Sequence, residues 1–282
     1  MVSSSVNLTM SKTRDETMVT INGTSALVSN MGSDVAIVVT HPWSFLGGNM
    51  YNNVVTSLVR FFQSLSVTTL RFNFYGGLGR GHTQVAQLQE CCRWLCQNAN
   101  IVATRGSPKN KNCNPSSILL IGYSYGALIA GSALASVPEC VGYCGIATPF
   151  GVSHWLTPFS AGHHLANAAA RPRVPRLLLQ GSEDGFTEEA QFSRKVAGYP
   201  ADATTAAVLP GADHFFRGKE RVVAGAISQW MLASYPELRR DLSNLADVTL
   251  RVAEEEEGGE EPEKGTVAEK KTVRSICGWL EH

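Results

Sequence analysis

The sequence of 282 residues lacks any uncharged apolar run that approaches the ~20 residues needed to cross a lipid bilayer. It also lacks an excess of charge of either sign, because 24 Lys and Arg residues balance 24 Asp and Glu residues. A protein that binds nucleic acid or anionic membranes carries a basic excess. We therefore expect neither an integral membrane segment nor a nucleic-acid partner.

A disulfide framework and a secretion signal are missing as well. The seven cysteines are an odd number and contain no CxxC pair, which favours reduced thiols. Three of them, Cys91, Cys92 and Cys96, fall in one helical pattern and are expected to pack as small apolar side chains. The first 17 residues have no apolar stretch typical of a signal peptide. The sequence thus predicts a cytoplasmic protein with a flexible N-terminus at 1–17.

Charge is unevenly distributed near the C-terminus. Residues 254–271 contain eight Glu and three Lys, a local net charge of −5. This stretch has almost nothing to bury, so we expect a solvated, disordered segment within a C-terminal extension at 236–282. A protein partner that binds the acidic stretch is the alternative. The globular domain is then expected at 18–235.

Short apolar runs alternate with helical patterns between the termini, which predicts a mostly parallel sheet covered by helices on both faces, an α/β fold. Strands are expected at 34–41, 69–74, 117–122, 140–147, 175–181 and 204–211, and helices at 52–65, 84–97, 126–136, 188–198 and 219–234. Ligands of such sheets bind beyond the carboxyl ends of the strands. The residues that follow each strand are therefore the candidates for a functional site.

The segment Gly122-Tyr123-Ser124-Tyr125-Gly126 stands between a predicted strand and a predicted helix. This G-x-S-x-G pattern at a strand-to-helix turn exposes a serine hydroxyl at the sheet edge, and the helix N-terminus behind it favours developing negative charge. Ser124 is therefore the candidate nucleophile. A glycine-rich turn with an idle serine is the alternative interpretation.

A serine nucleophile needs a base and an orienting carboxylate. His214 lies in the loop after the last predicted strand, and Asp184 follows the fifth strand. The order Ser124, Asp184, His214 is that of the α/β-hydrolase triad. Glu183 and Asp213 are the competing carboxylates, but Asp213 adjoins the histidine and Glu183 is expected to point the other way.

An oxyanion hole requires two N–H donors. One is expected from the backbone of Tyr125, the residue after the nucleophile, and the other from the loop after the first strand. Because Pro42 has no N–H, Trp43 is the preferred second donor and Ser44 the substitute. His41 precedes this position and is expected to shape the loop by hydrogen bonding.

The segment 148–174, 27 residues between the fourth and fifth strands, is long enough only for a small cap over the site. An apolar substrate pocket is expected from side chains near the loop ends and the cap, namely His41, Tyr123, Phe150, Trp155 and Phe159. Packing of the cap aromatics onto the core is the alternative. The pair His163-His164 lacks further ligands at suitable spacing, so no metal is expected. The glycines at 76–81 lack the residues of a phosphate loop, so no dinucleotide or other cofactor is expected.

From about residue 33 to 234 the chain resembles the α/β-hydrolase superfamily. The loop that begins at His41 reads HPWSFLGGNMYNNVV. It is similar to the HPxPxxGGxMxNxVV loop of small lidless members related to the dienelactone-hydrolase and serine-aminopeptidase-like groups. The segment LRFNFYGGLGRG, which contains Arg71 and Asn73, is similar to the LRFNFRGVGxSxG segment of the same members. The sequence departs from these patterns at Trp43-Ser44, at Tyr75 and in the 254–282 extension. The resemblance implies an α/β-hydrolase fold.

These residues together predict a serine hydrolase that cleaves a carboxylic ester or thioester of a small-molecule acyl substrate through an acyl-enzyme on Ser124. An aminopeptidase-like activity on the same fold is one alternative, and it requires an acidic pocket for the substrate ammonium. A hydrolase-like scaffold without turnover is the other, because a fold does not fix a function.

Overall fold

The computed structural model describes residues 16–76, 79–102 and 114–235. The predictions for the N-terminal 15 residues, the extension at 236–282 and its acidic stretch lie outside these residues. Two residues that the sequence assigned to the flexible N-terminus are described: Thr17 opens the first strand, and Glu16 pairs with Arg71 in the interior. Within the described ranges no helix combines the length and the hydropathy that a bilayer crossing requires.

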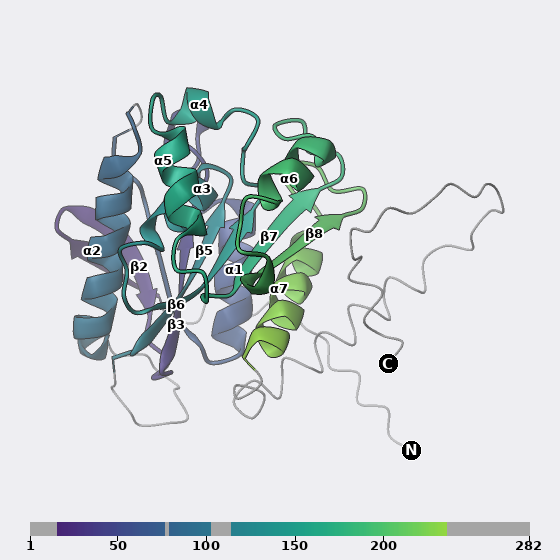
Figure 1. Ribbon diagram of the computed structural model, residues 1–282. Coiled ribbons are helices and arrows are strands. Elements are labelled where there is room, and N and C mark those ends of the chain that lie inside the picture. The colour runs from purple at the N-terminus through teal and green to yellow at the C-terminus, as the bar shows by residue number, and fades with distance from the viewer. Residues whose placement is uncertain (1–15, 77–78, 103–113, 236–282) are drawn as a thin grey trace, which may run out of the picture.

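A single eight-stranded sheet forms the centre of the molecule, in the order β1-β2-β4-β3-β5-β6-β7-β8 (Figure 1). Strands β3 to β8 run parallel to one another, and the β1–β2 hairpin adds two antiparallel strands at one edge. The strands are β1 (Thr17–Ile21), β2 (Thr24–Ser29), β3 (Val35–Thr40), β4 (Thr68–Phe72), β5 (Ser117–Tyr123), β6 (Cys140–Ile146), β7 (Arg176–Gly181) and β8 (Thr204–Leu209).

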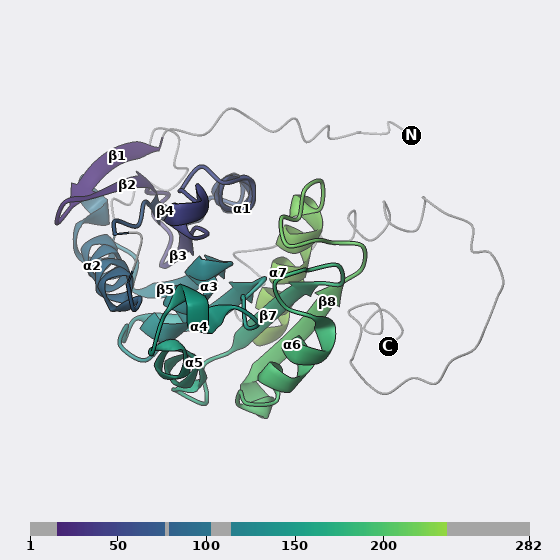
Figure 2. The same cartoon turned by 90° about the horizontal axis from the view of Figure 1, so that it is seen from above.

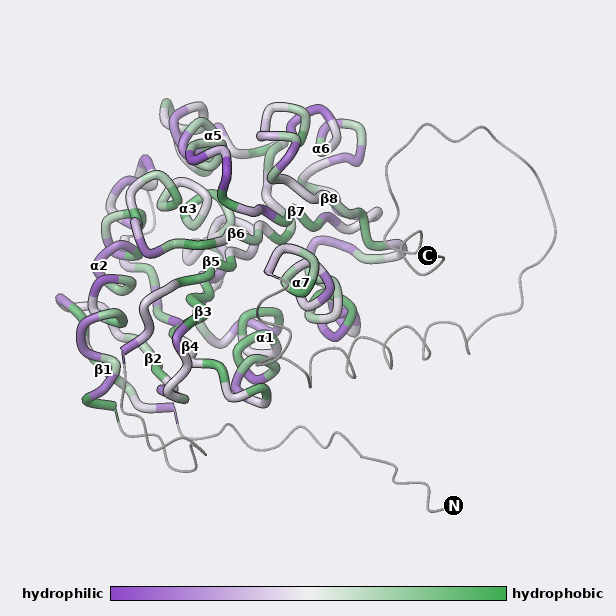
Figure 3. Tube along the Cα trace, turned by 60° about the horizontal axis from the view of Figure 1, so that its bottom comes forward, coloured by the Kyte–Doolittle hydropathy of each residue, from purple (hydrophilic) through white to green (hydrophobic). Residues whose placement is uncertain are grey.

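Helices cover both faces of this sheet, as the alternating sequence pattern predicts (Figure 3). One face packs against α1 (Asn53–Ser64) and α7 (Glu220–Ser234). The other packs against α2 (His82–Asn98), α3 (Tyr125–Ala133), α5 (Ala161–Ala169) and α6 (Glu189–Val196). The short helix α4 (Ser153–Leu156) and the 3-10 turns η1 (Ser44–Leu46), η2 (Ala99–Ile101) and η3 (Ala201–Ala203) complete the described elements.

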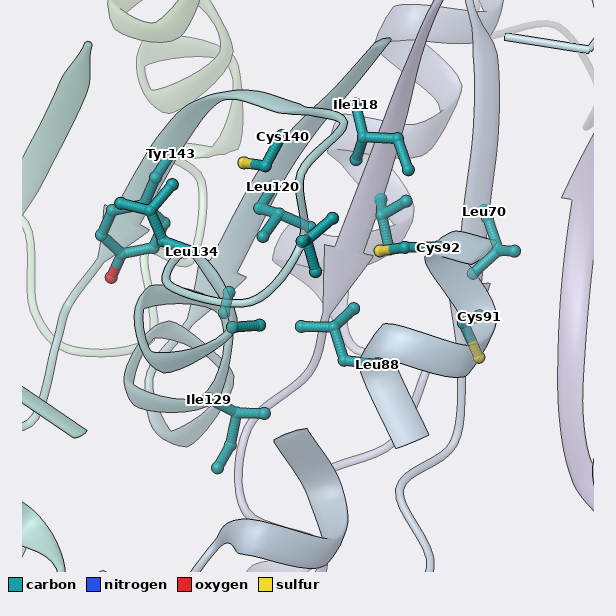
Figure 4. Close-up of a cluster of buried hydrophobic side chains, with 14 of the residues drawn as sticks. Leu70, Leu88, Cys91, Cys92, Ile118, Leu120, Ile129, Leu134, Cys140 and Tyr143 are labelled. Atoms are coloured by element: carbon teal, nitrogen blue, oxygen red, sulfur yellow. The ribbon is translucent and has the colours of Figure 1, made fainter. Parts of the chain in front are cut away.

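Side chains of the central strands alternate between two apolar cores, because successive residues of a strand point to opposite faces. In β3, Ala36 and Val38 face the α2–α3 side, whereas Ile37 and Val39 face the α1–α7 side. Both sets are buried, which explains the continuous apolar runs of the sequence. Figure 4 shows part of the first core, where Leu88, Cys91 and Cys92 of α2 lie close to the sheet. The cysteines of the described residues are unpaired, and Cys91 and Cys92 pack as predicted.

Each of the six predicted strands and five predicted helices is present, with ends displaced by a few residues. The β1–β2 hairpin is not among the strands predicted from the sequence. Its turn is Asn22-Gly23, and both residues adopt positive φ, 45° and 82°. An Asn-Gly pair between alternating strands is a strong signal for a tight hairpin, so the signal was present in TMVTINGTSALVS.

Candidate active site

Ser124 lies in a sharp turn between β5 and α3 and has φ 55° and ψ −122°. A non-glycine residue held at positive φ is strained and persists only where the surroundings enforce it. Here two glycines permit the turn. A Cβ at Gly122 would overlap the backbone of Ala127, and one at Gly126 would lie 2.7 Å from the carbonyl oxygens of Thr40 and His41.

The structure brings together three side chains that are far apart in the sequence. The Ser124 hydroxyl donates to Nε2 of His214 at 2.9 Å, and Nδ1–H of His214 donates to Oδ2 of Asp184 at 2.7 Å. All three residues are buried. Because β5, β7 and β8 are parallel (Figure 1), the loops after them meet at the same edge of the sheet, where the three residues lie.

The two competing carboxylates have other environments. Oδ1 of Asp213 accepts the backbone N–H groups of Phe215 and Phe216, so this side chain closes a turn beside the histidine. Glu183 is exposed. Asp184, in contrast, uses its second oxygen, Oδ1, to accept the N–H of Phe186 at 2.8 Å and that of Thr187 at 3.3 Å, which fixes the carboxylate that faces His214.

The loop that carries His214 is held from two sides. The hydroxyl of Tyr123 donates to the carbonyl oxygen of His214 at 2.8 Å, and Nδ2 of Asn53 donates to the carbonyl oxygen of Phe215 at 3.1 Å. Burial, with a smaller contribution from the nearby Asp184, raises the pKa of Tyr123, so its hydroxyl stays a donor. Tyr123 is predicted from the sequence as a pocket residue, and this anchoring contact has no signal in the sequence.

The first residues of α3 face the loop after β3. The Tyr125 N–H belongs to the first helical residue and therefore has no acceptor within the helix. The Thr40 hydroxyl donates to the carbonyl oxygen of Gly126 at 2.9 Å, which joins the end of β3 to the start of α3. Trp43 follows only three residues later and precedes η1. The roles of Tyr125 and Trp43 as oxyanion donors stay predictions.

His41 holds the loop after β3 in place through hydrogen bonds of its imidazole ring. Its Nδ1–H donates to the carbonyl oxygen of Pro42 at 2.6 Å, and its Nε2 accepts the N–H of Phe74 at 2.9 Å. Burial lowers the pKa of His41 to about 4, although the bond to Pro42 opposes the shift. The ring is therefore neutral near pH 7 and joins the loops after β3 and β4.

This burial predicts a pH-dependent stability. The unfolded chain binds a proton at His41 near pH 6.5 and the folded chain only near 4, so the free energy of unfolding falls as the pH drops through this interval. We expect a contribution of about 2 kcal/mol to be lost between pH 7 and 5. Urea unfolding at both pH values, with His41→Gln and the exposed control His154→Gln, measures it. An equal pH dependence in His41→Gln and the wild type would contradict the assignment.

Three of the five residues predicted to line a substrate pocket are buried in the structure. Phe150 is a core residue that packs against Phe192 and Tyr199, and His41 and Tyr123 are buried with their polar atoms bonded inside the protein. None of these three residues exposes more than 2% of its surface. Trp155 and Phe159 are exposed instead, Phe159 at 96% of its surface, with the Arg80 guanidinium over its ring.

His164 of the cap region has a structural role. His164 is buried, its Nδ1 lies 2.8 Å from the Ser132 hydroxyl, and its Nε2 lies 2.6 Å from the carbonyl oxygen of Arg80. Burial lowers the pKa of this imidazole. Across the described parts of the chain, no group of three or more His, Cys, Asp or Glu side chains has a geometry suited to a metal ion.

Comparison with known proteins finds similarity of fold to solved serine hydrolases. No family model matches the chain. An uncharacterised protein of Rickettsia prowazekii is 27% identical over 225 residues, which covers 75% of this chain and 84% of that protein.

Two solved structures give the fold more directly. A serine hydrolase homologue from Coxiella burnetii superposes with a TM-score of 0.58 at 23% identity and covers 77% of this chain and 96% of its own. A serine hydrolase without a lid from Xanthomonas campestris gives 0.59 at 22% identity, with 77% and 94% covered. The sheet order, the elbow at Ser124 and these neighbours confirm the fold predicted from the sequence: the chain has the α/β-hydrolase fold.

Proposed function

We propose that the protein is a serine hydrolase that cleaves a carboxylic ester or thioester through an acyl-enzyme on Ser124. The observation that carries this proposal is the unbroken chain of hydrogen bonds from the Ser124 hydroxyl through His214 to Asp184. A serine hydroxyl is a weak nucleophile unless an adjacent base takes its proton, and His214 Nε2 is placed to do so.

In the first half of the proposed reaction, Oγ of Ser124 attacks the acyl carbon while its proton moves to Nε2 of His214. Asp184 orients the imidazole and stabilises the imidazolium that forms. The N–H groups of Tyr125 and Trp43 are assigned to the oxyanion of the tetrahedral intermediate. When the intermediate collapses, the carbon–oxygen or carbon–sulfur bond breaks, and His214 gives its proton to the departing alcohol or thiol.

In the second half, a water molecule attacks the acyl-enzyme. His214 takes a proton from this water, and as the bond between the acyl carbon and Oγ of Ser124 breaks, His214 gives that proton to Oγ, which releases the carboxylic acid and restores the serine hydroxyl. The structural neighbours support the class of reaction, since an esterase from Pyrococcus furiosus superposes at a TM-score of 0.58 with 15% identity. The intact serine, base and carboxylate favour turnover over a scaffold role.

The proposal is tested with a fluorophosphonate probe, which a reactive serine attacks with loss of fluoride. We expect the wild type to carry the label on the peptide that contains Ser124, and Ser124→Ala and His214→Ala to remain unlabelled. Ser136→Ala is the matched control, because Ser136 lies just beyond α3 outside the site and binds Gln89. Labelling that survives Ser124→Ala would contradict the proposal. Nitrophenyl esters, thioesters and aminoacyl anilides then separate esterase, thioesterase and aminopeptidase activity.

A further inference from the structure

Exposed apolar side chains gather on the face that holds Ser124. Of the ten large apolar side chains exposed in the described part of the chain, eight lie in segments that follow the carboxyl ends of β3, β4, β6, β7 or β8. Only Met18 and Ile101 lie elsewhere. Figure 2 looks down on this face, on which the short helix α4 lies. Such a concentration of apolar surface marks an interaction site.

Two of these side chains contact the proposed base itself. The ring of Phe186 lies 4.3 Å from the His214 ring, and the ring of Phe215 lies 5.7 Å from it in an edge-on arrangement. Both rings stay partly open to solvent, with 37% and 47% of their surface exposed. The imidazole is therefore flanked by two apolar surfaces that a ligand can still cover.

Both aromatic residues are also held in place. The backbone N–H of Phe186 donates to Asp184, and the carbonyl of Phe215 accepts from Asn53. The guanidinium of Arg217 lies over the Phe215 ring at 5.5 Å. A ligand that packs on these rings does not have to order them first, which increases the affinity available from a small apolar contact.

The proton transfer from His214 determines which part of the substrate lies next to these two rings. Nε2 of His214 delivers its proton to the leaving oxygen or sulfur, so the leaving group must lie next to the imidazole. A group attached to that atom extends along the sides of the ring, where Phe186 and Phe215 stand. We propose that Phe186 and Phe215 form the binding site for an apolar alcohol or thiol portion of the substrate. This inference rests on the proposed function and names the leaving group as its specificity-determining part.

The test varies the alcohol while the acid stays constant. We measure kcat/KM for methyl, butyl and hexyl acetate with the full chain in a pH-stat, because these alkyl alcohols have similar intrinsic reactivity as leaving groups. The wild type is expected to prefer hexyl over methyl acetate by about tenfold, as alkyl groups that enter an apolar site gain at least this factor. Phe186→Ser and Phe215→Ser are each expected to reduce the preference to about threefold, and the double variant to abolish it.

Three controls keep the outcomes separate. Phe186→Leu keeps an apolar side chain and is expected to retain most of the preference, whereas Met18→Ala removes an exposed apolar side chain away from this face and is expected to change nothing. A series of ethyl esters from acetate to hexanoate should respond equally in wild type and Phe186→Ser, because the acyl chain lies elsewhere. Thermal unfolding verifies that each variant is folded.

An unchanged alcohol preference in the double variant, with Ser124 still labelled by the fluorophosphonate, would overturn this inference and leave the proposed function intact. A change confined to the acyl series would also overturn it, since the rings would then face the acid portion. Absence of both labelling and ester turnover in the wild type would overturn the proposed function, and this inference with it.

Discussion

Replacement of Asp184 by Asn is expected to lower kcat on a nitrophenyl ester by about 10⁴, with a much smaller change in KM. The carboxylate accepts the Nδ1–H of His214 at 2.7 Å and so keeps the lone pair of Nε2 directed at the Ser124 hydroxyl. An amide at this position can donate to Nδ1 instead. The proton then moves to Nε2, which can no longer accept the proton of the serine.

The same substitution at the two neighbouring carboxylates provides matched controls. Asp213→Asn keeps an oxygen that accepts the N–H groups of Phe215 and Phe216, and Glu183→Gln alters an exposed side chain. Both variants are expected to keep kcat within about threefold of the wild-type value, because exposed substitutions that remove no buried contact have small effects. Steady-state kinetics, with thermal unfolding to verify folding, measures all three. A large loss in Asp213→Asn with none in Asp184→Asn would reverse the assignment of the orienting carboxylate.

The candidate site was predictable from the sequence because its determinants are short and its topology is simple. The elbow around Ser124 needs only a strand, two small residues and a helix, and these lie within the contiguous segment 117–133. Asp184 and His214 each follow a parallel strand, and parallel strands end at one edge of their sheet. Candidates selected at the strand ends therefore lie close together, although 90 residues separate Ser124 from His214.

The burial of His41, Tyr123 and Phe150 was not predictable in the same way, because burial is decided by partners that are distant in sequence. Phe150 stands at the start of the cap segment, but Phe192 of α6 and the later Tyr199 enclose it in the core. Phe186 and Phe215 were not predicted from the sequence as ligand-binding residues. Their proposed role in substrate binding depends on the short distances between their rings and the His214 ring. The β1–β2 hairpin was missed although its Asn22-Gly23 turn is a strong local signal, because the two short strands beside it give little periodic signal.

Arg176, at the start of β7, has a buried guanidinium. Of the variants proposed for this protein, substitution of Arg176 is expected to cause the largest loss of stability. Its side chain is fully buried, and none of the ion pairs among the described residues involves it. It donates instead to carbonyl oxygens at the end of α5 and in the following turn: Nε to Ala168 at 2.9 Å, Nη1 to Val174 at 2.6 Å, and Nη2 to Arg171 at 3.1 Å and to Ala170. The last carbonyls of a helix have no partners within it and carry partial negative charge, so a cation stabilises them.

Arg176→Met is therefore expected to lower the free energy of unfolding by about 5 kcal/mol, because four carbonyl groups, one buried and three partly buried, each lose a charged donor at once. For a domain of this size, that loss lowers Tm by roughly 10 to 20 °C. Arg173→Met, at an exposed arginine in the same turn, is the matched control and should shift Tm by no more than about 2 °C.

Activity distinguishes this effect from damage to the site. Helix α5 lies directly against α3, where a Cβ at Gly131 would come within 2.8 Å of the Ala168 side chain. Arg176 itself touches neither Ser124 nor His214, so below its Tm the variant should keep kcat within about threefold while the chain melts earlier. A folded Arg176→Met protein with unchanged Tm would show that water or local rearrangement satisfies these carbonyls as well as the guanidinium does. A loss of kcat at unchanged Tm would instead show that the end of α5 controls the geometry of the nucleophile through α3.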